Sequence, residues 1–258
     1  MSCTVTEPEL LTSALALPLS SNPFRLKQDL DDGDIYREFA SSHDASRFFR
    51  FPNVKVEMQE RKPGLLHFNP PDGQCRMLTF KSPFQPVNPR LHDRYLKNER
   101  NRHAIAQYWT HNCGPRPTIC VIHGFMADPY WVNSLFLGLP WFYKLGYDIL
   151  LYTLPFHGAR QGPFSPFSGH GYFANGISHI AETVAHSIYD FRIFLNYLER
   201  IGVPRFGVTG ISLGSILLLV ALGLAATWAL ALIVLGLGAW LRAPPAAPLP
   251  PPVAYAAG

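Results

Sequence analysis

Three short apolar runs, separated by longer helix-like segments, constrain the fold of this chain more than any other feature. Residues 118–122 and 147–154 are rich in β-branched and aliphatic side chains, and residues 205–211 form a third run of this kind. Continuous apolar runs are typical of central strands that are buried on both faces. Their alternation with helical segments predicts a parallel, doubly wound sheet, whose ligand sites lie at the carboxyl ends of the strands.

The segments around these runs add the remaining elements. Residues 177–201 place apolar side chains on one broad face, which predicts a long amphipathic helix. Residues 162–176 are rich in Gly, Pro, Ser and Phe and are long enough to be a lid or an active-site wall. Residues 54–58 and 77–80 predict an antiparallel hairpin at a sheet edge, and the spacing in 91–111 predicts a helix.

Each apolar run ends in residues that can carry chemistry. The first is followed by His123-Gly124-Phe125-Met126, the second by Pro155-Phe156-His157-Gly158, and the third leads into Gly210-Ile211-Ser212-Leu213-Gly214. A serine on a tight strand-to-helix turn needs small neighbours two residues to either side, since larger side chains would collide. Gly210 and Gly214 meet this need, so the stretch has the form of a nucleophile elbow.

Taken in this order, the three motifs resemble the α/β-hydrolase superfamily over roughly residues 53–214. The resemblance implies a mostly parallel α/β sheet and a serine hydrolase that acts on an ester or related acyl substrate without a cofactor or metal. It implies Ser212 as the nucleophile, and the backbone N–H of Leu213 with that of Phe125 or Met126 as the oxyanion hole. His123, with Gly124, Gly210 and Gly214, is then a motif-supporting residue that shapes the oxyanion loop and is not the general base.

The chain departs from the superfamily after the serine. The triad of that superfamily runs Ser, then Asp or Glu, then His, but from Leu213 onward the only charged residue is Arg242, and no histidine follows. The sheet is therefore expected to be incomplete on its C-terminal side, and we expect little or no turnover in this form. The upstream candidates are interpreted as structural, namely His157, His170, His179, His186 and Asp190, and Asp148 is expected at the opposite end of the sheet.

Residues 215–241 carry no charge, and a membrane helix needs about 20 apolar residues. Trp240 and Arg242 resemble an interfacial anchor at the far end. Three interpretations remain open for this stretch. It is a transmembrane span from Ser215 to Leu241 that tethers the domain, a long apolar helix buried in the fold, or sequence foreign to the family, as a frame change after Gly214 would produce.

The predicted domain organisation has four parts: an N-terminal extension (1–52), a partial α/β-hydrolase domain (53–214), the apolar helix (215–241) and a Pro/Ala-rich tail (242–258). Charged residues make up only 16% of the chain without a basic run, which argues against nucleic acid as a partner. The four cysteines show no C-x-x-C pair, which fits a reducing compartment. No basic residue precedes the first apolar patch, so a secretory signal is not expected.

Two function classes follow from these observations. One is the serine hydrolase with a small ester or acyl substrate, weak or inactive because the acid and the histidine are missing. The other is a non-enzymatic, membrane-tethered binding domain of the same fold. The expected location is the cytoplasm or a membrane reached through residues 215–241. A metal hydrolase is disfavoured, because the histidines form no H-x-H or H-x-x-x-H pair.

Overall fold

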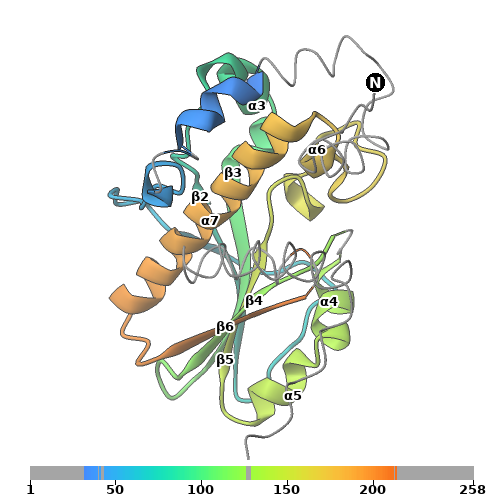
Figure 1. The fold of residues 1–258 in the computed structure, drawn as a ribbon. Coiled ribbons are helices and arrows are strands. Elements are labelled where there is room, and N and C mark those ends of the chain that lie inside the picture. The colour runs from blue at the N-terminus through green and yellow to red at the C-terminus, as the bar shows by residue number, and fades with distance from the viewer. Residues whose placement is uncertain (1–31, 40, 42–43, 126–128, 212, 214–258) are drawn as a thin grey trace, which may run out of the picture.

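The computed structural model describes residues 32–39, 41, 44–125, 129–211 and 213. Within these ranges a single six-stranded sheet carries helices on both faces (Figure 1). The strands are β1 (Gln59–Arg61), β2 (Gly73–Lys81), β3 (His103–His111), β4 (Thr118–Ile122), β5 (Asp148–Thr153) and β6 (Phe206–Gly210). The helices are α3 (His92–Leu96), α4 (Tyr130–Phe136), α5 (Leu139–Lys144), α6 (His170–Phe173) and α7 (Ile177–Arg200), with short 3-10 turns η1 (Ala45–Arg47), η2 (Pro89–Leu91), η3 (Glu99–Arg102) and η4 (Gly158–Arg160).

The strand order is β1-β2-β3-β5-β4-β6. The pairs β1–β2, β2–β3 and β3–β5 are antiparallel, whereas β4 is parallel to both β5 and β6. The first strands of the sheet, β1 to β3, are antiparallel, and the later strands, β4 to β6, are parallel to one another with β4 lying between β5 and β6. This arrangement fits the α/β-hydrolase resemblance. The predicted mostly parallel sheet was wrong in its proportions, because the sheet is mixed and three of these five pairings are antiparallel.

The error comes from residues 91–111, which the spacing assigned to one helix. Only short helical turns, η2, α3 and η3, occupy the first part, and β3 occupies the rest. In β3 the buried residues Ala104, Ala106 and Tyr108 alternate along the strand. Its whole length pairs with β2 on one side, and its five residues from Ile105 to Trp109 pair with β5 on the other. These cross-strand partners, which are distant in sequence, decide between two periodicities that a short apolar pattern leaves open.

The three predicted parallel strands and the long amphipathic helix are confirmed. Strands β4, β5 and β6 coincide with the three apolar runs, and α7 coincides with the predicted long helix to within one residue. The edge hairpin exists as β1 paired with β2, although its first strand begins at Gln59 and not in residues 54–58. The sheet edge where the three motifs lie is therefore built from the segments that the sequence identified best.

Two apolar clusters hold the layers together. One lies between the sheet and α7, and the other lies beneath α4 and α5 on the opposite face (Figure 1). Strand β5 serves both, because Leu150 and Tyr152 enter the first cluster while Ile149 and Leu151 enter the second. Alternate side chains of a strand point to opposite faces, so burial on both faces explains why β5 is apolar throughout.

Part of the N-terminal extension packs on this frame. Residues 32–39 are helical, and the Tyr36 hydroxyl donates to Glu182 Oε1 of α7 at 2.8 Å. Phe48 packs, half-buried, against the first cluster. Across the ranges given above, no helix is long and apolar enough to cross a membrane. Residues 215–241 and the tail 242–258 lie outside those ranges, as does most of the extension.

Candidate active site

The carboxyl ends of three neighbouring parallel strands form the edge that the sequence singled out, hereafter the rim. Ile122 of β4 pairs with Tyr152 of β5 on one side and with Gly210 of β6 on the other. The Ile211 N–H still donates to the Ile122 carbonyl at 3.3 Å, so the chain leaves β6 beside β4. His123 follows β4 directly and His157 follows β5 by four residues. Among the predicted site residues, Ser212, Met126 and Gly214 lie outside the described residues.

His123 is locked in one neutral form at the rim. Its ring is 2% exposed, Nδ1 donates to the Gly124 carbonyl at 2.7 Å, and Nε2 accepts the Leu154 N–H at 3.1 Å. Burial lowers the pKa of His123 to about 4. Because both ring nitrogens are engaged, His123 ties the end of β4 to the end of β5 and has no free site for a proton. This geometry fits a loop-shaping role and not that of a general base.

His157 packs edge-to-face on His123, with ring centroids 4.9 Å apart. Its Nδ1 donates to the Pro155 carbonyl at 2.9 Å, while its Nε2 is buried and has no hydrogen-bond partner among the described residues. Burial, followed by the effect of His123, lowers the pKa of His157 to about 3. At the rim His157 thus offers one unoccupied nitrogen, but that nitrogen is a weak base at neutral pH.

The turn that carries His157 is held in an unusual backbone conformation. Phe156 has φ of 62°, in the left-handed region that a bulky residue seldom adopts. Its N–H donates to Asn101 Oδ1 at 2.9 Å. Arg160, which is fully buried, donates to the Thr153 carbonyl at 3.1 Å and to the Asn101 carbonyl at 2.9 Å. These contacts over-determine the turn, which is how such strain persists in a fold.

Arg160 also joins a buried network that contains serine, histidine and aspartate. Asp190 Oδ2 lies 2.7 Å from Arg160 Nη2 and 3.0 Å from His186 Nε2, and the Ser82 hydroxyl donates to Asp190 Oδ1. Asp190 and Ser82 both contact Nε2 of His186, whereas Nδ1 meets the Tyr95 hydroxyl at 2.9 Å. In a triad the acid and the serine must lie on different ring nitrogens, so this cluster is structural, as the sequence interpretation held for His186 and Asp190.

The aromatic wall over the rim comes from residues 162–176 and from the loop after β4. Phe125 packs edge-to-face on His157, Phe167 and Phe173. Gly169 has φ of 89°, and a Cβ placed there would lie 2.4 Å from His157 Nε2. The close approach of this loop to His157 therefore requires glycine. Leu213, the other predicted oxyanion residue that the structure describes, is buried.

Asp148 lies at the opposite edge, where β5 begins, as predicted. Its Oδ1 accepts the His111 N–H at 3.0 Å and contacts His111 Nδ1 at 2.8 Å, and its Oδ2 accepts the Arg116 N–H at 3.2 Å. The carboxylate is fully buried and committed to these groups. Asp148 therefore cannot supply the missing acid at the rim.

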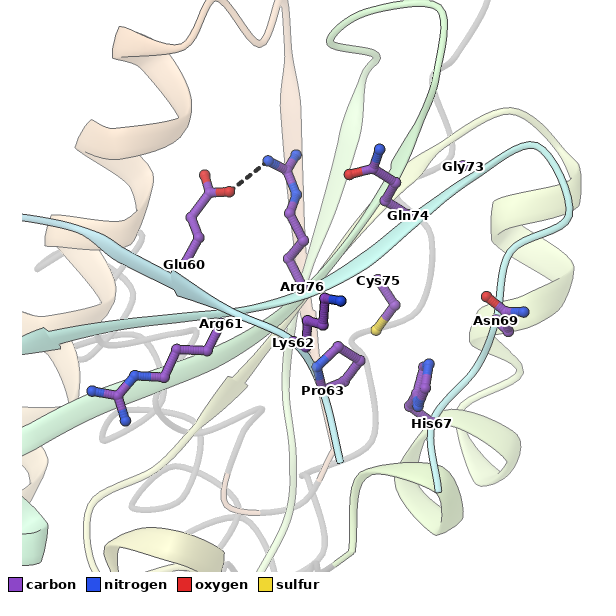
Figure 2. A pocket seen from close by; sticks show the side chains of 10 residues that line it. All are labelled: Glu60, Arg61, Lys62, Pro63, His67, Asn69, Gly73, Gln74, Cys75 and Arg76. Atoms are coloured by element: carbon purple, nitrogen blue, oxygen red, sulfur yellow. Dashed lines mark hydrogen bonds and ion pairs between the residues drawn. The ribbon is translucent and has the colours of Figure 1, made fainter. Parts of the chain in front are cut away.

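A cavity of about 510 Å³ lies beside β1 and β2 (Figure 2). Figure 2 shows the ion pair of Arg76 and Glu60, in which Arg76 Nη1 lies 2.8 Å from Glu60 Oε2. Cys75 lines this cavity, and burial raises the pKa of its thiol to about 12, which keeps the thiol protonated at neutral pH. Because β3 and β5 separate it from β4, this cavity does not belong to the rim.

The described residues contain no group of three or more His, Cys, Asp or Glu side chains that could hold a metal ion. The three cysteines among them, Cys75, Cys113 and Cys120, are free thiols. Two residues that fix the site, Asn101 and Arg160, were missed from the sequence. Nothing in the local pattern marks them, since their partners lie far along the chain.

No family model matches this chain, and no curated protein matches it. Similar solved structures are acetyl xylan esterase 1 from Thermoanaerobacterium sp. JW/SL YS485 (15% identity, TM-score 0.49, 71% of this chain and 54% of that one) and the acetyl xylan esterase from Paenibacillus sp. R4 (17%, 0.47, 73% and 55%). A CE15 glucuronoyl esterase from Teredinibacter turnerae T7901 is also similar (12%, 0.38, 72% and 49%). The matches span about half the length of those proteins.

Proposed function

We propose that this chain is a serine hydrolase of the α/β type that acts on an ester or related acyl substrate. Ser212 is the nucleophile of the proposal, and the N–H groups of Leu213 and of Phe125 or Met126 are its oxyanion donors. The observation that carries it is the exit of β6. Ile211 is still hydrogen-bonded to the last residue of β4, and the glycine-flanked serine is the next residue along the chain.

The proposed activity is weak. A serine hydroxyl needs a base to take its proton, and no Asp, Glu or His follows Leu213. His123 cannot serve, because both of its nitrogens are engaged. His157 has a free Nε2, but its lowered pKa makes it a poor acceptor. What remains for catalysis is binding and oxyanion stabilisation, which by themselves give only a residual rate.

The test is an assay of the full chain with p-nitrophenyl acetate and p-nitrophenyl butyrate, together with labelling by a fluorophosphonate. We expect slow hydrolysis and slow labelling, both lost in Ser212→Ala and both kept in the matched variant Ser165→Ala. Robust turnover that depends on Ser212 would contradict our account of the missing base. Labelling that survives Ser212→Ala would contradict the nucleophile itself.

A second candidate function, the membrane-tethered binding domain, is favoured by an exposed apolar face on α4 and α5. Trp131, Leu135, Phe136 and Trp141 are between 41% and 75% exposed there, although they are large and apolar. Contiguous apolar surface of this kind is typical of protein or membrane contacts. This candidate, and the proposed location in the cytoplasm or at a membrane, are tested by fractionation of the chain with and without residues 215–258. Recovery of both forms in the soluble fraction would exclude tethering.

A further inference from the structure

A groove of about 740 Å³ opens between α3–η3 and residues 162–175, and no step of the proposed hydrolysis uses it. Its two walls differ in chemistry. Basic side chains from α3–η3 line one wall, and the other consists of the loop before α6, with Phe164, and of α6 itself. The floor consists of buried rings. The lining residues that matter below are Arg94, Lys97, Arg100, Phe156, Phe164 and His179.

The basic wall carries more positive than negative charge. Glu99, the acidic residue in the lining, is paired with Arg102 at 3.0 Å. Arg94 is itself held in a long ion pair with the buried Asp32, 3.8 Å from Nη2 to Oδ2. Lys97 and Arg100 have no ion pair with any other described residue, and both are exposed. The wall therefore presents a net positive charge to whatever enters the groove.

The opposite wall mixes apolar with polar groups, since Pro163 and Phe164 stand beside Ser165, His170 and Asn175, while the floor is aromatic. Phe164 is 97% exposed, although phenylalanine is a residue type that is most often buried. Phe156 and Tyr95 meet edge-to-face at the floor, with ring centroids 5.7 Å apart. A ligand with an aromatic or aliphatic body would remove this apolar surface from water, which is the main source of affinity in concave sites.

A buried histidine with an unused nitrogen completes the floor. His179 is 2% exposed and lies between the rings of Tyr95 and Phe156, at 5.0 and 5.1 Å. The Thr183 hydroxyl donates to the His179 carbonyl at 2.7 Å and lies 3.4 Å from Nδ1, but no described residue bonds Nε2. Burial, with help from Arg94, lowers the pKa of His179 to about 3. Because His179 lines the groove, its neutral ring offers a bound ligand a polar group among the aromatic side chains.

We propose that this groove binds a carboxylic acid with an aromatic or aliphatic body. The carboxylate faces Arg94, Lys97 and Arg100, and the body packs on Phe156 and Phe164 within reach of His179. Carboxylates make strong, charge-assisted hydrogen bonds with guanidinium groups. The site is distinct from the rim, because Phe156 lines the groove while the next side chain, His157, packs on His123.

The experiment measures binding by the full chain in isothermal titration, with 3-phenylpropionate and 3-phenylpropan-1-ol as matched probes. We expect the Kd of the acid to be about 10-fold lower than the Kd of the alcohol. Added salt should reduce that difference, because the groove is open to solvent. Equal affinity for the two probes would overturn the proposal.

Variants locate the site and guard against misfolding. The triple variant Arg94→Gln, Lys97→Gln, Arg100→Gln should remove the preference for the acid, and Phe164→Ser should weaken both probes. All four positions are exposed, so the fold should survive. Lys144→Gln, at the exposed end of α5, is the matched charge control and should bind as the parent chain does. A triple variant that keeps the preference would refute the assignment. Binding in Ser212→Ala should be unchanged, which separates this result from that of the hydrolase test.

Discussion

Arg160 and Asp190 form an ion pair, 2.7 Å from Nη2 to Oδ2, in which both side chains are completely buried. The pair joins the turn after β5 to the middle of α7. Burial alone would raise the pKa of Asp190, but His186 and Arg160 outweigh it and hold that pKa below its usual value. The charged pair is thus retained in the interior, where it fixes the backbone that presents His157.

The first prediction concerns this ion pair. Asp190→Asn leaves the Arg160 charge buried without its partner, and we expect a loss of about 3–5 kcal/mol in the free energy of unfolding. The matched control is Glu99→Gln, which breaks the exposed pair with Arg102. Exposed pairs contribute less than about 1 kcal/mol. Urea denaturation of the two variants measures both values, and similar small losses would show that the buried pair is not needed to hold the turn.

The second prediction separates backbone strain from steric contact at the aromatic wall. Gly169 and Gly202 have nearly the same φ, 89° and 85°, but a Cβ at Gly202 would meet nothing within 4 Å. Gly202→Ala should cost about 1–2 kcal/mol, the usual price of a left-handed alanine. Gly169→Ala should cost a further 1–3 kcal/mol, roughly, because His157 must move to admit the new methyl group. Equal losses for the two variants would mean that the loop does not press on His157.

The third prediction is a dependence of stability on pH. His123, His157 and His179 have folded-state pKa values of about 4, 3 and 3, all below the usual value of 6.5. The unfolded chain therefore binds more protons than the folded chain below pH 6.5. Stability is fully present above that pH and is lost as the pH falls from 6.5 towards 4. Each group contributes on the order of 3 kcal/mol across this window.

Chemical denaturation at a series of pH values between 7 and 4 tests this linkage. At pH 5 these three rings should contribute an uptake of about three protons on unfolding, and His186, whose pKa burial also lowers, should add to that uptake. His103→Gln, which alters an exposed histidine at the start of β3, should leave the slope unchanged. A slope near zero between pH 6.5 and 5 would contradict the buried neutral state of these rings.

The fourth prediction concerns the acceptor for the strained turn. Asn101→Leu removes the oxygen that accepts the Phe156 N–H at 2.9 Å, and the donor then remains buried without a partner. We expect a loss of about 1–3 kcal/mol in the free energy of unfolding. Asn98→Ala is the control, since the bond from its side chain to the Arg160 carbonyl is long at 3.4 Å. If both variants unfold alike, Asn101 does not maintain the conformation of Phe156.

The sequence predicted the parallel part of the sheet well and the antiparallel part poorly. Strands β4 and β5 are buried on both faces, and a run of apolar residues without interruption has few alternatives to such a strand. Strand β3 contains polar residues, Gln107 and Thr110 among them, and these interrupt the two-residue apolar alternation that would have indicated a strand. Its partners in β2 and β5 lie between 22 and 48 positions away in the sequence, and local spacing carries no information about them.

The site shows the same division. His123 and His157 were found because short motifs at strand ends mark the edge where the ends of parallel strands meet. Asn101 and Arg160 could not be found, because Asn101 acts on Phe156 across 55 positions and Arg160 on Asp190 across 30. Their roles depend on burial, which only the assembled fold creates. Ser212 remains a prediction from its motif.

Phe156 and His157 share one peptide plane, yet their rings belong to different neighbourhoods. Phe156 lies at the floor of the groove, and His157 lies against His123. A rotation of the Phe156 backbone out of its left-handed conformation would also swing the adjoining peptide, because that unit is rigid. A ligand that displaces the Phe156 ring in the groove should therefore also shift His157 at the rim. The groove and the rim are thus mechanically coupled through this one peptide unit.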